Sequence, residues 1–303
     1  MIPHQLPCII TAGGIPTPRD PLFALTNGRP KAMLDMHGRP MLQWVLDGVQ
    51  GAACVGDVVV VGLDDAADRE ALRPQRPVHH LPNQRSLVGN VQAGLQWVRQ
   101  NLPEAQMALL CSADMHHLQS FMVDELVAEC APFDKLFYYT IAERKTIEAQ
   151  YPNSGRTFTK LRDAEFAGGD LFVVQLKVLE KTQPAFWESL TNARKRPWQM
   201  AKLVGLKTLW RLLTRQLTVG EAAELAGQMM GANGPIGVIF LRHAAVAMDA
   251  DKPAQVDLLR QKRPMSRFRM TGSPNCLHES DTDEEMPTTK RGARNGEPLL
   301  APQ

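Results

Sequence analysis

Residues 6–42 read LPCIITAGGIPTPRDPLFALTNGRPKAMLDMHGRPML. The stretch begins as an apolar run and reaches the pair Gly13-Gly14, a pattern that predicts a buried strand followed by a tight turn. Two Gly-Arg-Pro triplets then enclose one lysine, Lys31, and each proline disfavours helix in the residue before it. We therefore expect a loop that carries Lys31 to the end of the first strand, with a helix starting after Pro40.

Strand-like and helix-like segments alternate through the first half of the chain. Apolar residues recur at helical spacing in three segments, residues 40–52, 86–101 and 121–131. Ser86 is placed to cap the second of these helices. Uninterrupted apolar runs, typical of strands buried on both faces, occupy residues 55–65, 106–115 and 135–142. This order predicts an α/β fold with a Rossmann-like, mostly parallel mixed sheet and helices on both faces.

The second half of the chain is less regular. Residues 156–175 look like two strands joined through a turn at Gly168-Gly169, and residues 243–251 have strand character. Between them, residues 176–231 predict a helical insertion that contains a basic amphipathic helix, which either packs on its own domain or lies on a membrane surface. From residue 262 to residue 303, charge blocks and scattered prolines with few apolar residues predict a disordered tail.

Composition narrows the class of protein. The chain has 303 residues, of which 44% are hydrophobic, so a folded core is expected. A net charge of +2 gives no overall attraction for nucleic acid, and no run approaches the ~20 apolar residues of a membrane span. Five cysteines without CxxC spacing, and an N-terminus without signal-peptide character, predict reduced thiols in a cytoplasmic protein.

The ends of the predicted strands are where a parallel sheet binds ligands. At the first of them, Gly13 and Gly14 would present backbone amides to a polyphosphate, with Arg19 and Lys31 as nearby cations. A plain strand-to-loop turn is the alternative explanation of the glycine pair. The motif is neither a Walker loop nor a GxGxxG loop.

Three aspartates follow apolar runs and are candidate metal ligands. Asp114 stands near the end of the apolar run at residues 106–115, where it would hold Mg²⁺ by one oxygen. The alternative is that its side chain makes a turn or caps a helix. Asp249 and Asp251 would point to one face of a strand, and their mutual repulsion favours a cation between them. The alternative for Asp251 is that it caps a helix opened by Lys252-Pro253.

Taken in order, these motifs resemble the signature of the MobA-like NTP transferases and the sugar-phosphate nucleotidylyltransferases, which share a glycosyltransferase-A-like fold. The resemblance is carried by Gly13-Gly14, Leu25-Thr26, Pro30-Lys31 with Leu34, and residues 38–42. The later segments CSADM, FAGGDLF and MDADKPAQVDLL resemble further motifs of that superfamily. Together they cover about residues 1–260, so the resemblance implies a catalytic domain at 1–261.

The resemblance implies an enzyme that moves a nucleoside monophosphate from an NTP to a phosphorylated small molecule with Mg²⁺ and releases pyrophosphate. Its implied catalytic residues are Lys31 with Arg19 or Arg29. Its implied metal ligands are Asp114 and Asp251, with Asp249 as the substitute. The implied nucleotide-binding residues are Ala12, Gly13, Gly14, Asn83 and Ser86, and the implied acceptor side is Gly168 and Gly169.

One departure from the family pattern keeps two other functions open. Ile15-Pro16 stands where the family has a second loop glycine, and proline offers no N–H to a phosphate. The chain would then be either a nucleotide-binding homologue without turnover or, if the late Asp-Ala-Asp motif binds a nucleotide sugar, a glycosyltransferase of the same fold.

Overall fold

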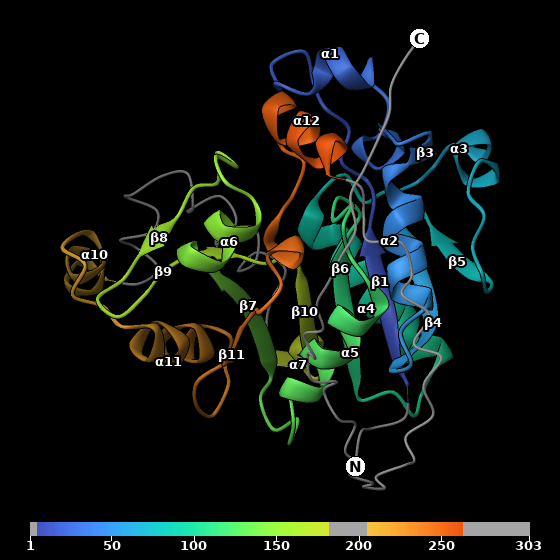
Figure 1. Ribbon diagram of the computed structural model, residues 1–303. Helices are drawn as coiled ribbons and strands as arrows, with labels where there is room; N and C mark the ends of the chain where they lie inside the picture. The colour runs from blue at the N-terminus through green and yellow to red at the C-terminus, as the bar shows by residue number, and fades with distance from the viewer. Residues whose placement is uncertain (1–4, 182–204, 263–303) are drawn as a thin grey trace, which may run out of the picture. The chain divides into compact units, whose positions relative to one another are not determined.

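The computed structural model describes residues 5–181 and 205–262 (Figure 1). Its strands are β1 Leu6–Thr11, β2 Asp35–Met36, β3 Arg39–Pro40, β4 Val55–Val61, β5 Val78–Leu81, β6 Met107–Ser112, β7 Phe137–Glu143, β8 Thr159–Lys160, β9 Glu165–Gly168, β10 Leu171–Gln175 and β11 Gly237–Phe240. Its helices are α1 Phe23–Thr26, η1 Lys31–Met33, α2 Met41–Gln50, α3 Ala66–Glu70, α4 Leu87–Asn101, α5 Ser120–Glu129, α6 Arg144–Gln150, α7 Val178–Lys181, α10 Leu206–Leu213, α11 Val219–Met229, η2 Ala244–Ala247 and α12 Pro253–Gln261.

The large sheet has a parallel half and a mixed half. Its strand order is β5-β4-β1-β6-β10-β7-β9-β8, and β11 pairs with β7 outside this path. Strands β5, β4, β1 and β6 are parallel to one another, whereas β10 runs antiparallel to both β6 and β7. The predicted α/β mixed sheet with a parallel core is confirmed, and the carboxyl ends of β1 and β6 meet at one edge.

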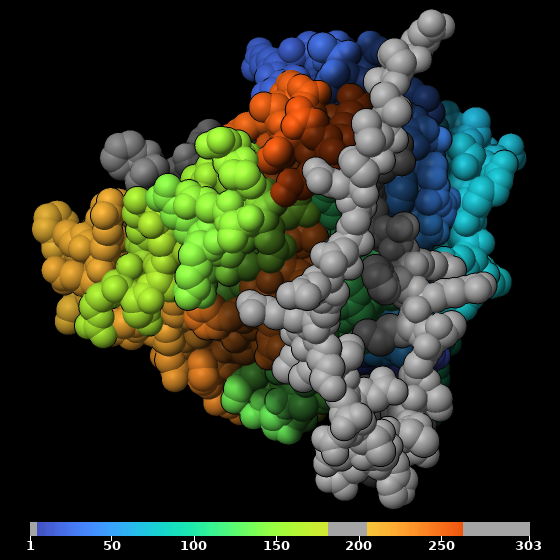
Figure 2. Space-filling model, in the orientation of Figure 1, coloured from blue at the N-terminus to red at the C-terminus, as the bar shows by residue number. Residues whose placement is uncertain are grey.

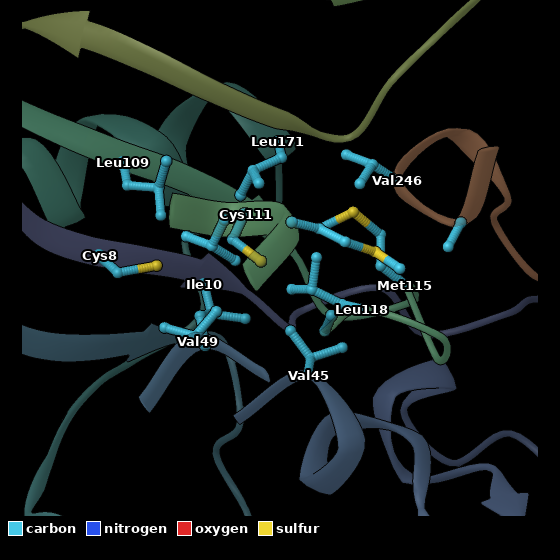
Figure 3. Close-up of a cluster of buried hydrophobic side chains, with 14 of the residues drawn as sticks. Cys8, Ile10, Val45, Val49, Leu109, Cys111, Met115, Leu118, Leu171 and Val246 are labelled. Atoms are coloured by element: carbon cyan, nitrogen blue, oxygen red, sulfur yellow. The ribbon is translucent and has the colours of Figure 1, made fainter. Parts of the chain in front are cut away.

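Alternate residues of the central strands belong to two separate cores. Cys8 and Ile10 of β1 pack with α2 and α5, while Ile9 packs on the opposite face with α4. Figure 3 shows the first core, in which side chains of β1 and β6 face Val45 and Val49 of α2. Since side chains of a strand alternate between faces, helices on both faces are needed to bury such continuous apolar runs.

Helix α4 begins where the sequence placed it. The hydroxyl of Ser86 accepts a hydrogen bond from the backbone N–H of Gly89 at 3.0 Å, so Ser86 is the predicted N-cap. The preceding Arg85 has a φ of 59°, which turns the chain sharply into the helix. The cap fixes the N-terminus of α4 beside the end of β1.

Residues 156–175 contain the two predicted strands, β9 and β10, which meet at Gly168-Gly169, but the predicted turn is wrong because the glycine pair does not reverse the chain. Strands β9 and β10 run in the same direction along one edge of β7, with Gly168 opposite Ile141 and Val173 opposite Tyr138. The register changes by two residues between them, which makes Gly169-Asp170 a bulge rather than a reversal. Beyond the bulge, β10 also pairs with β6 and so joins the two halves of the sheet.

Residues 243–251 do not form a strand either. Residues Ala244–Ala247 form the 3-10 helix η2, and residues 248–251 are irregular. Alanine is a weak strand former, and a short apolar run does not distinguish a strand from a buried helical turn. The shared strand face expected for Asp249 and Asp251 is therefore absent, and their side chains go to different partners.

The predicted insertion at 176–231 is described only in part. Helices α7, α10 and α11 fall within it, and residues 182–204 lie outside the described residues. Helix α10 exposes its apolar side chains, with Leu206 at 78% and Trp210 at 66% exposure. The predicted tail at 262–303 lies outside the description from residue 263 onward, so the domain limits stay a prediction.

The C-terminal helix α12 returns to the N-terminal part of the chain. The guanidinium of Arg260 donates hydrogen bonds to the carbonyl of Asp35, at 2.7 Å from Nη2. Figure 2 shows the orange α12 in contact with the blue N-terminal segment. This packing brings residue 251, which precedes α12, to the end of β1. Of the helices in the described ranges, none combines the length and the apolarity that crossing a bilayer requires.

Two adjacent histidines, His116 and His117, are buried, and the ring of His116 packs on Trp44 of α2. His116 is fully buried, and its two ring nitrogens have no hydrogen-bond partner among the described residues. Burial, with help from His117 and His37, lowers the pKa of His116 from 6.5 to about 3. His117 is also buried, but its Nδ1 contacts the hydroxyl of Tyr151 at 2.8 Å and its Nε2 contacts the carbonyl of Lys262 at 2.7 Å.

We expect His116→Phe to flatten the loss of stability in acid. Below the ordinary pKa of 6.5 the unfolded chain binds a proton at residue 116 that the folded chain refuses until about pH 3. The free energy of unfolding then falls by up to about 1.4 kcal/mol per pH unit as the pH drops through this window. Urea unfolding measured between about pH 7 and pH 4 would show the slope reduced in the variant.

His117→Phe is the comparison variant for this prediction: burial also lowers the pKa of His117, so this substitution should reduce the pH slope too. It removes the hydrogen bonds to Tyr151 and Lys262, so it should lower stability at neutral pH as well. A His116→Phe protein that keeps the wild-type pH slope would contradict the assignment.

Candidate active site

A pocket lies at the carboxyl ends of β1 and β6. It is formed by the glycine loop after β1, the segment around Lys31, the start of α4, the end of β6 and the segment that leads into α12. The lining residues are Thr11, Ala12, Gly13, Gly14, Ile15, Lys31, Ala32, Arg85, Ser86, Leu87, Asn90, Ser112, Ala113, Asp114 and Asp251. These residues come from segments up to 240 positions apart, and the sheet edge brings them together.

The glycine loop is held by an amide network behind it. Asn83 donates from Nδ2 to the carbonyl of Gly13 at 3.0 Å, and its Oδ1 accepts from Nδ2 of Asn90 at 3.3 Å. A Cβ on Gly13 would lie 2.6 Å from Asn90 Nδ2 and 2.7 Å from Asn83 Oδ1, whereas a Cβ on Gly14 would meet nothing within 4 Å. Gly13 is therefore required for packing, and Gly14 faces open space.

Lys31 bridges two carboxylates at the floor of this pocket. Its backbone N–H donates to the carbonyl of Gly14 at 2.9 Å, which joins the lysine segment to the glycine loop. Its Nζ donates to Oδ2 of Asp114 at 2.6 Å and also to Oδ1 of Asp251. The side chains of Lys31 and Asp114 are each 15% exposed, so this contact is shielded from water, whereas Asp251 is 62% exposed.

The two ion pairs decide the charges of these groups. Burial opposes the charge on Lys31, but Asp114 and Asp251 raise its pKa above the ordinary value. Burial alone would raise the pKa of Asp114, and the adjacent Lys31 lowers it instead. Lys31 is therefore a permanent cation and Asp114 a permanent anion near neutral pH.

A second charged pair lies next to the first. Arg156 and Asp249 form an ion pair in which both side chains are 12% exposed, and Nη2 of Arg156 donates to the carbonyl of Gly168 at 3.0 Å. Asp170, in the bulge between β9 and β10, has an Oδ2 atom that is buried without a hydrogen-bond partner. Burial, with Asp114 and Asp249 nearby, raises the pKa of Asp170 well above its ordinary range.

The donor set suits Mg²⁺ held jointly by protein and phosphate. Oδ1 of Asp114 is buried and accepts no hydrogen bond within the described chain, so it is free for a cation. Within residues 5–181 and 205–262, no group of three or more His, Cys, Asp or Glu side chains is arranged to hold a metal. Mg²⁺ usually binds through one or two carboxylates together with substrate phosphates and water, which matches this arrangement.

Seven of the predicted site residues meet in the pocket. They are Ala12, Gly13, Gly14, Lys31, Ser86, Asp114 and Asp251. Asn83 lies one layer behind, where it supports Gly13, and Asp249 pairs with Arg156 instead of Lys31. Asp251 does not cap α12, because Lys252 is the N-cap residue and no side chain caps that helix end.

The two predicted arginines lie outside the pocket lining. Arg29 pairs with Asp68 of α3, a carboxylate whose side chain is only 5% exposed. Arg19 is exposed, and no described residue forms a hydrogen bond or an ion pair with it. Their contact with phosphate stays a prediction.

Gly168 ends β9 opposite Ile141 of β7, and the backbone N–H of Gly169 donates to the carbonyl of Thr140 in the same strand. A Cβ on Gly168 would lie 2.3 Å from the hydroxyl of Tyr139, and one on Gly169 would lie 2.3 Å from Oγ1 of Thr140. Close packing therefore requires both glycines, and their contact with an acceptor stays a prediction.

Four charged or amide side chains at the site were not among the residues predicted from sequence. Arg85 and Asn90 line the pocket, and their only signal was closeness to the predicted Ser86. Asp170 stands in the bulge after Gly168, which no local sequence pattern reveals. Arg156 stands in an irregular loop, so no local pattern distinguished it from other surface arginines.

The profile of the MobA-like NTP transferase domain matches residues 8–219, which is more than half of the chain. This chain belongs to the MobA-like NTP transferase family. The matched region contains the glycine loop, Lys31 and Asp114. Members of this family are nucleotidyltransferases, so the polar pocket described above belongs to a nucleotidyltransferase. No curated protein matches the chain.

Solved structures agree with this fold. A hypothetical transferase from Thermus thermophilus is 27% identical, with a TM-score of 0.69, and the match covers 83% of this chain and 99% of that one. A 4-diphosphocytidyl-2C-methyl-D-erythritol synthase is 12% identical with a TM-score of 0.51, covering 85% of this chain and 98% of its own. A CMP:2-keto-3-deoxy-manno-octonic acid synthetase complexed with CTP is 16% identical with a TM-score of 0.50, covering 85% and 97%.

We expect Gly13→Ala to destabilise this NTP transferase and Gly14→Ala to leave its stability unchanged. The new methyl group at residue 13 would push Asn83 and Asn90 apart, at a cost of about 1–3 kcal/mol. At residue 14 the methyl group enters open space, so the change stays within about 0.5 kcal/mol. Thermal unfolding of the two variants measures the difference, and equal melting temperatures would contradict the packing role of Gly13.

Proposed function

We propose that this protein transfers a nucleoside monophosphate from an NTP to the phosphate of a small-molecule acceptor, with Mg²⁺, and releases pyrophosphate. The observation that carries the proposal is the contact of Lys31 Nζ with both Asp114 and Asp251, at the floor of a pocket lined by a glycine loop. Family membership supports the nucleotidyl-transfer chemistry.

In the proposed reaction, a phosphate oxygen of the acceptor attacks the α-phosphorus of the NTP. A new P–O–P bond forms there, and the bond to the β-phosphate breaks, so that pyrophosphate leaves with the electron pair. The acceptor phosphate is already anionic, so the chain needs no general base. Catalysis then depends on positioning the two phosphates and neutralising their charge.

Lys31 is the chain's own charge-neutralising group in this mechanism. As a permanent cation, it can exchange one carboxylate partner for an oxygen of the α-phosphate or of the acceptor. The backbone amides at Gly13 and Gly14 would orient the phosphates, and the exposed Arg85 at the start of α4 would add a second cation.

Mg²⁺ would be held by Asp114 and Asp251, and when bound it would supply further neutralisation of the phosphate charge. Arg156 keeps Asp249 engaged in a separate ion pair. This pairing supports Asp251, rather than Asp249, as the second metal ligand.

We expect Lys31→Ala to reduce pyrophosphate release by about 10²–10³-fold. The variant removes the cation between two carboxylates, and the loss of one preorganised charge at a reacting phosphate typically has this size. The assay combines each NTP with Mg²⁺ and a panel of phosphorylated small molecules, and a nucleotide titration by calorimetry checks that the NTP still binds.

The control for Lys31→Ala is Lys135→Ala. Lys135 is a partly exposed lysine whose Nζ pairs with the neighbouring Asp134, and it is not part of the pocket lining. An unchanged rate of pyrophosphate release in Lys31→Ala would contradict the assignment of Lys31 to the active site. Wild-type protein that binds NTP without releasing pyrophosphate would instead establish the non-catalytic alternative, and transfer from a nucleotide sugar would establish a glycosyltransferase.

The two predicted arginines, Arg29 and Arg19, differ in their protein partners, so their variants should differ in stability. We expect Arg29→Ala to lower the melting temperature, because it leaves the buried Asp68 without its cation, whereas Arg19→Ala should not. If either arginine also binds the triphosphate, its variant will raise KM for the NTP. Steady-state kinetics beside thermal unfolding distinguishes a phosphate contact from a structural ion pair.

A further inference from the structure

An apolar cavity adjoins the polar pocket on the α4 face of the sheet. It has a volume of about 230 Å³ and is partly open to solvent. Aliphatic and aromatic side chains from α4, β6, β7 and β10 form most of its wall, including Val88, Val91, Leu110, Phe137, Phe172 and Val174. The proposed transfer reaction gives this cavity no role so far.

Half-buried aromatic rings continue the wall along the sheet. Phe172 of β10 stacks on Phe137 of β7, with ring centroids 5.6 Å apart, and on Tyr139 at 5.4 Å. These rings lie on the same face as α4, because alternate residues of β10 point to opposite cores. A row of this kind presents a large apolar surface to whatever enters the cavity.

The cavity is continuous with the proposed active site. Thr11, Leu87 and Ser112 line both the cavity and the polar pocket. Leu87 is 60% exposed at this boundary, and Asp170 lies at the cavity end that faces Asp114. A molecule with its phosphate near Lys31 and Asp114 can therefore place the rest of its body in the cavity.

We propose that the acceptor of the transfer reaction is a phosphorylated molecule with an apolar body, and that this body binds in the cavity between α4 and β10. The inference rests on the proposed function and adds its substrate class. The triphosphate and ribose of an NTP are polar and suit the pocket lined by Lys31, Arg85 and Asn90. A strongly polar sugar would leave the hydroxyl groups facing this wall without partners.

The test uses a homologous series of ethyl, hexyl and decyl phosphate, with glycerol 3-phosphate as the polar comparison. Binding is measured by calorimetry on the full chain, below micelle-forming concentrations, with Mg²⁺ and a non-hydrolysable NTP analogue present. Affinity should rise with chain length, by up to about fourfold per methylene group that the cavity covers. Pyrophosphate release with each acceptor is measured in parallel with ordinary NTPs.

Two variants place the binding in the cavity. Val91→Trp fills the space between α4 and β10, and Val88→Asp puts a charge into its wall, so each should remove the dependence on chain length. Gln96→Trp adds the same bulk at an exposed position of α4 outside the cavity lining and serves as the matched control. Nucleotide binding in all three variants shows that the polar pocket remains folded.

The outcomes separate this inference from the proposed function. Chain-length-dependent binding and turnover that both cavity variants abolish, and Gln96→Trp retains, would support the inference. Turnover with glycerol 3-phosphate and no gain from longer chains would overturn the inference and leave the transfer function standing. Alkyl phosphates that bind without turnover with any NTP would overturn the acceptor role, and displacement of the alkyl phosphate by the NTP analogue would assign the cavity to the nucleotide.

Discussion

One cation held between two carboxylates ties the catalytic end of this domain together. Lys31 comes from the loop after β1, Asp114 from the end of β6, and Asp251 from the approach to α12, 220 residues further along the chain. Removing an ammonium group from water is unfavourable, and the two partners offset that cost. The backbone N–H of Lys31 also donates a hydrogen bond to the carbonyl of Gly14, so the lysine segment holds the glycine loop in place as well.

The site brings together four carboxyl groups. Asp114, Asp170, Asp249 and Asp251 lie close enough to influence one another's protonation, while the cations among them are Lys31 and Arg156. Burial and the other carboxylates raise the pKa of Asp249 despite its ion pair with Arg156. A divalent cation bound among these carboxyl groups would favour their ionised form and would offset the charge of a triphosphate in the proposed reaction.

The mixed half of the sheet separates the charged groups of the pocket from the apolar cavity. Strand β10 enters between β6 and β7 after the bulge at Gly169-Asp170, so one end of it meets the charged groups. Farther along, Phe172 and Val174 form the wall of the apolar cavity. A bulge beside an active site commonly re-aims a side chain, and here the re-aimed side chain is Asp170.

The sequence by itself determined the local elements and the strand ends that carry chemistry. Continuous apolar runs and helical spacing are properties of neighbouring residues, so the parallel core, the Ser86 cap and the positions of Lys31 and Asp114 after their strands were predictable. The family followed from the order of those motifs, because an ordered set of short motifs is more specific than any one of them.

Only the tertiary structure decided which distant groups meet. In the structure, Asp251 forms an ion pair with Lys31, whereas Asp249 pairs with Arg156. The fold also places Arg85 in the pocket lining and Asp170 beside it. The expected strand at 243–251 and the expected Gly-Gly turn both failed, since short apolar or glycine-containing runs fit several backbone paths equally well. Packing chooses among those paths through contacts between segments far apart in the chain, and no pattern within a single segment encodes those contacts.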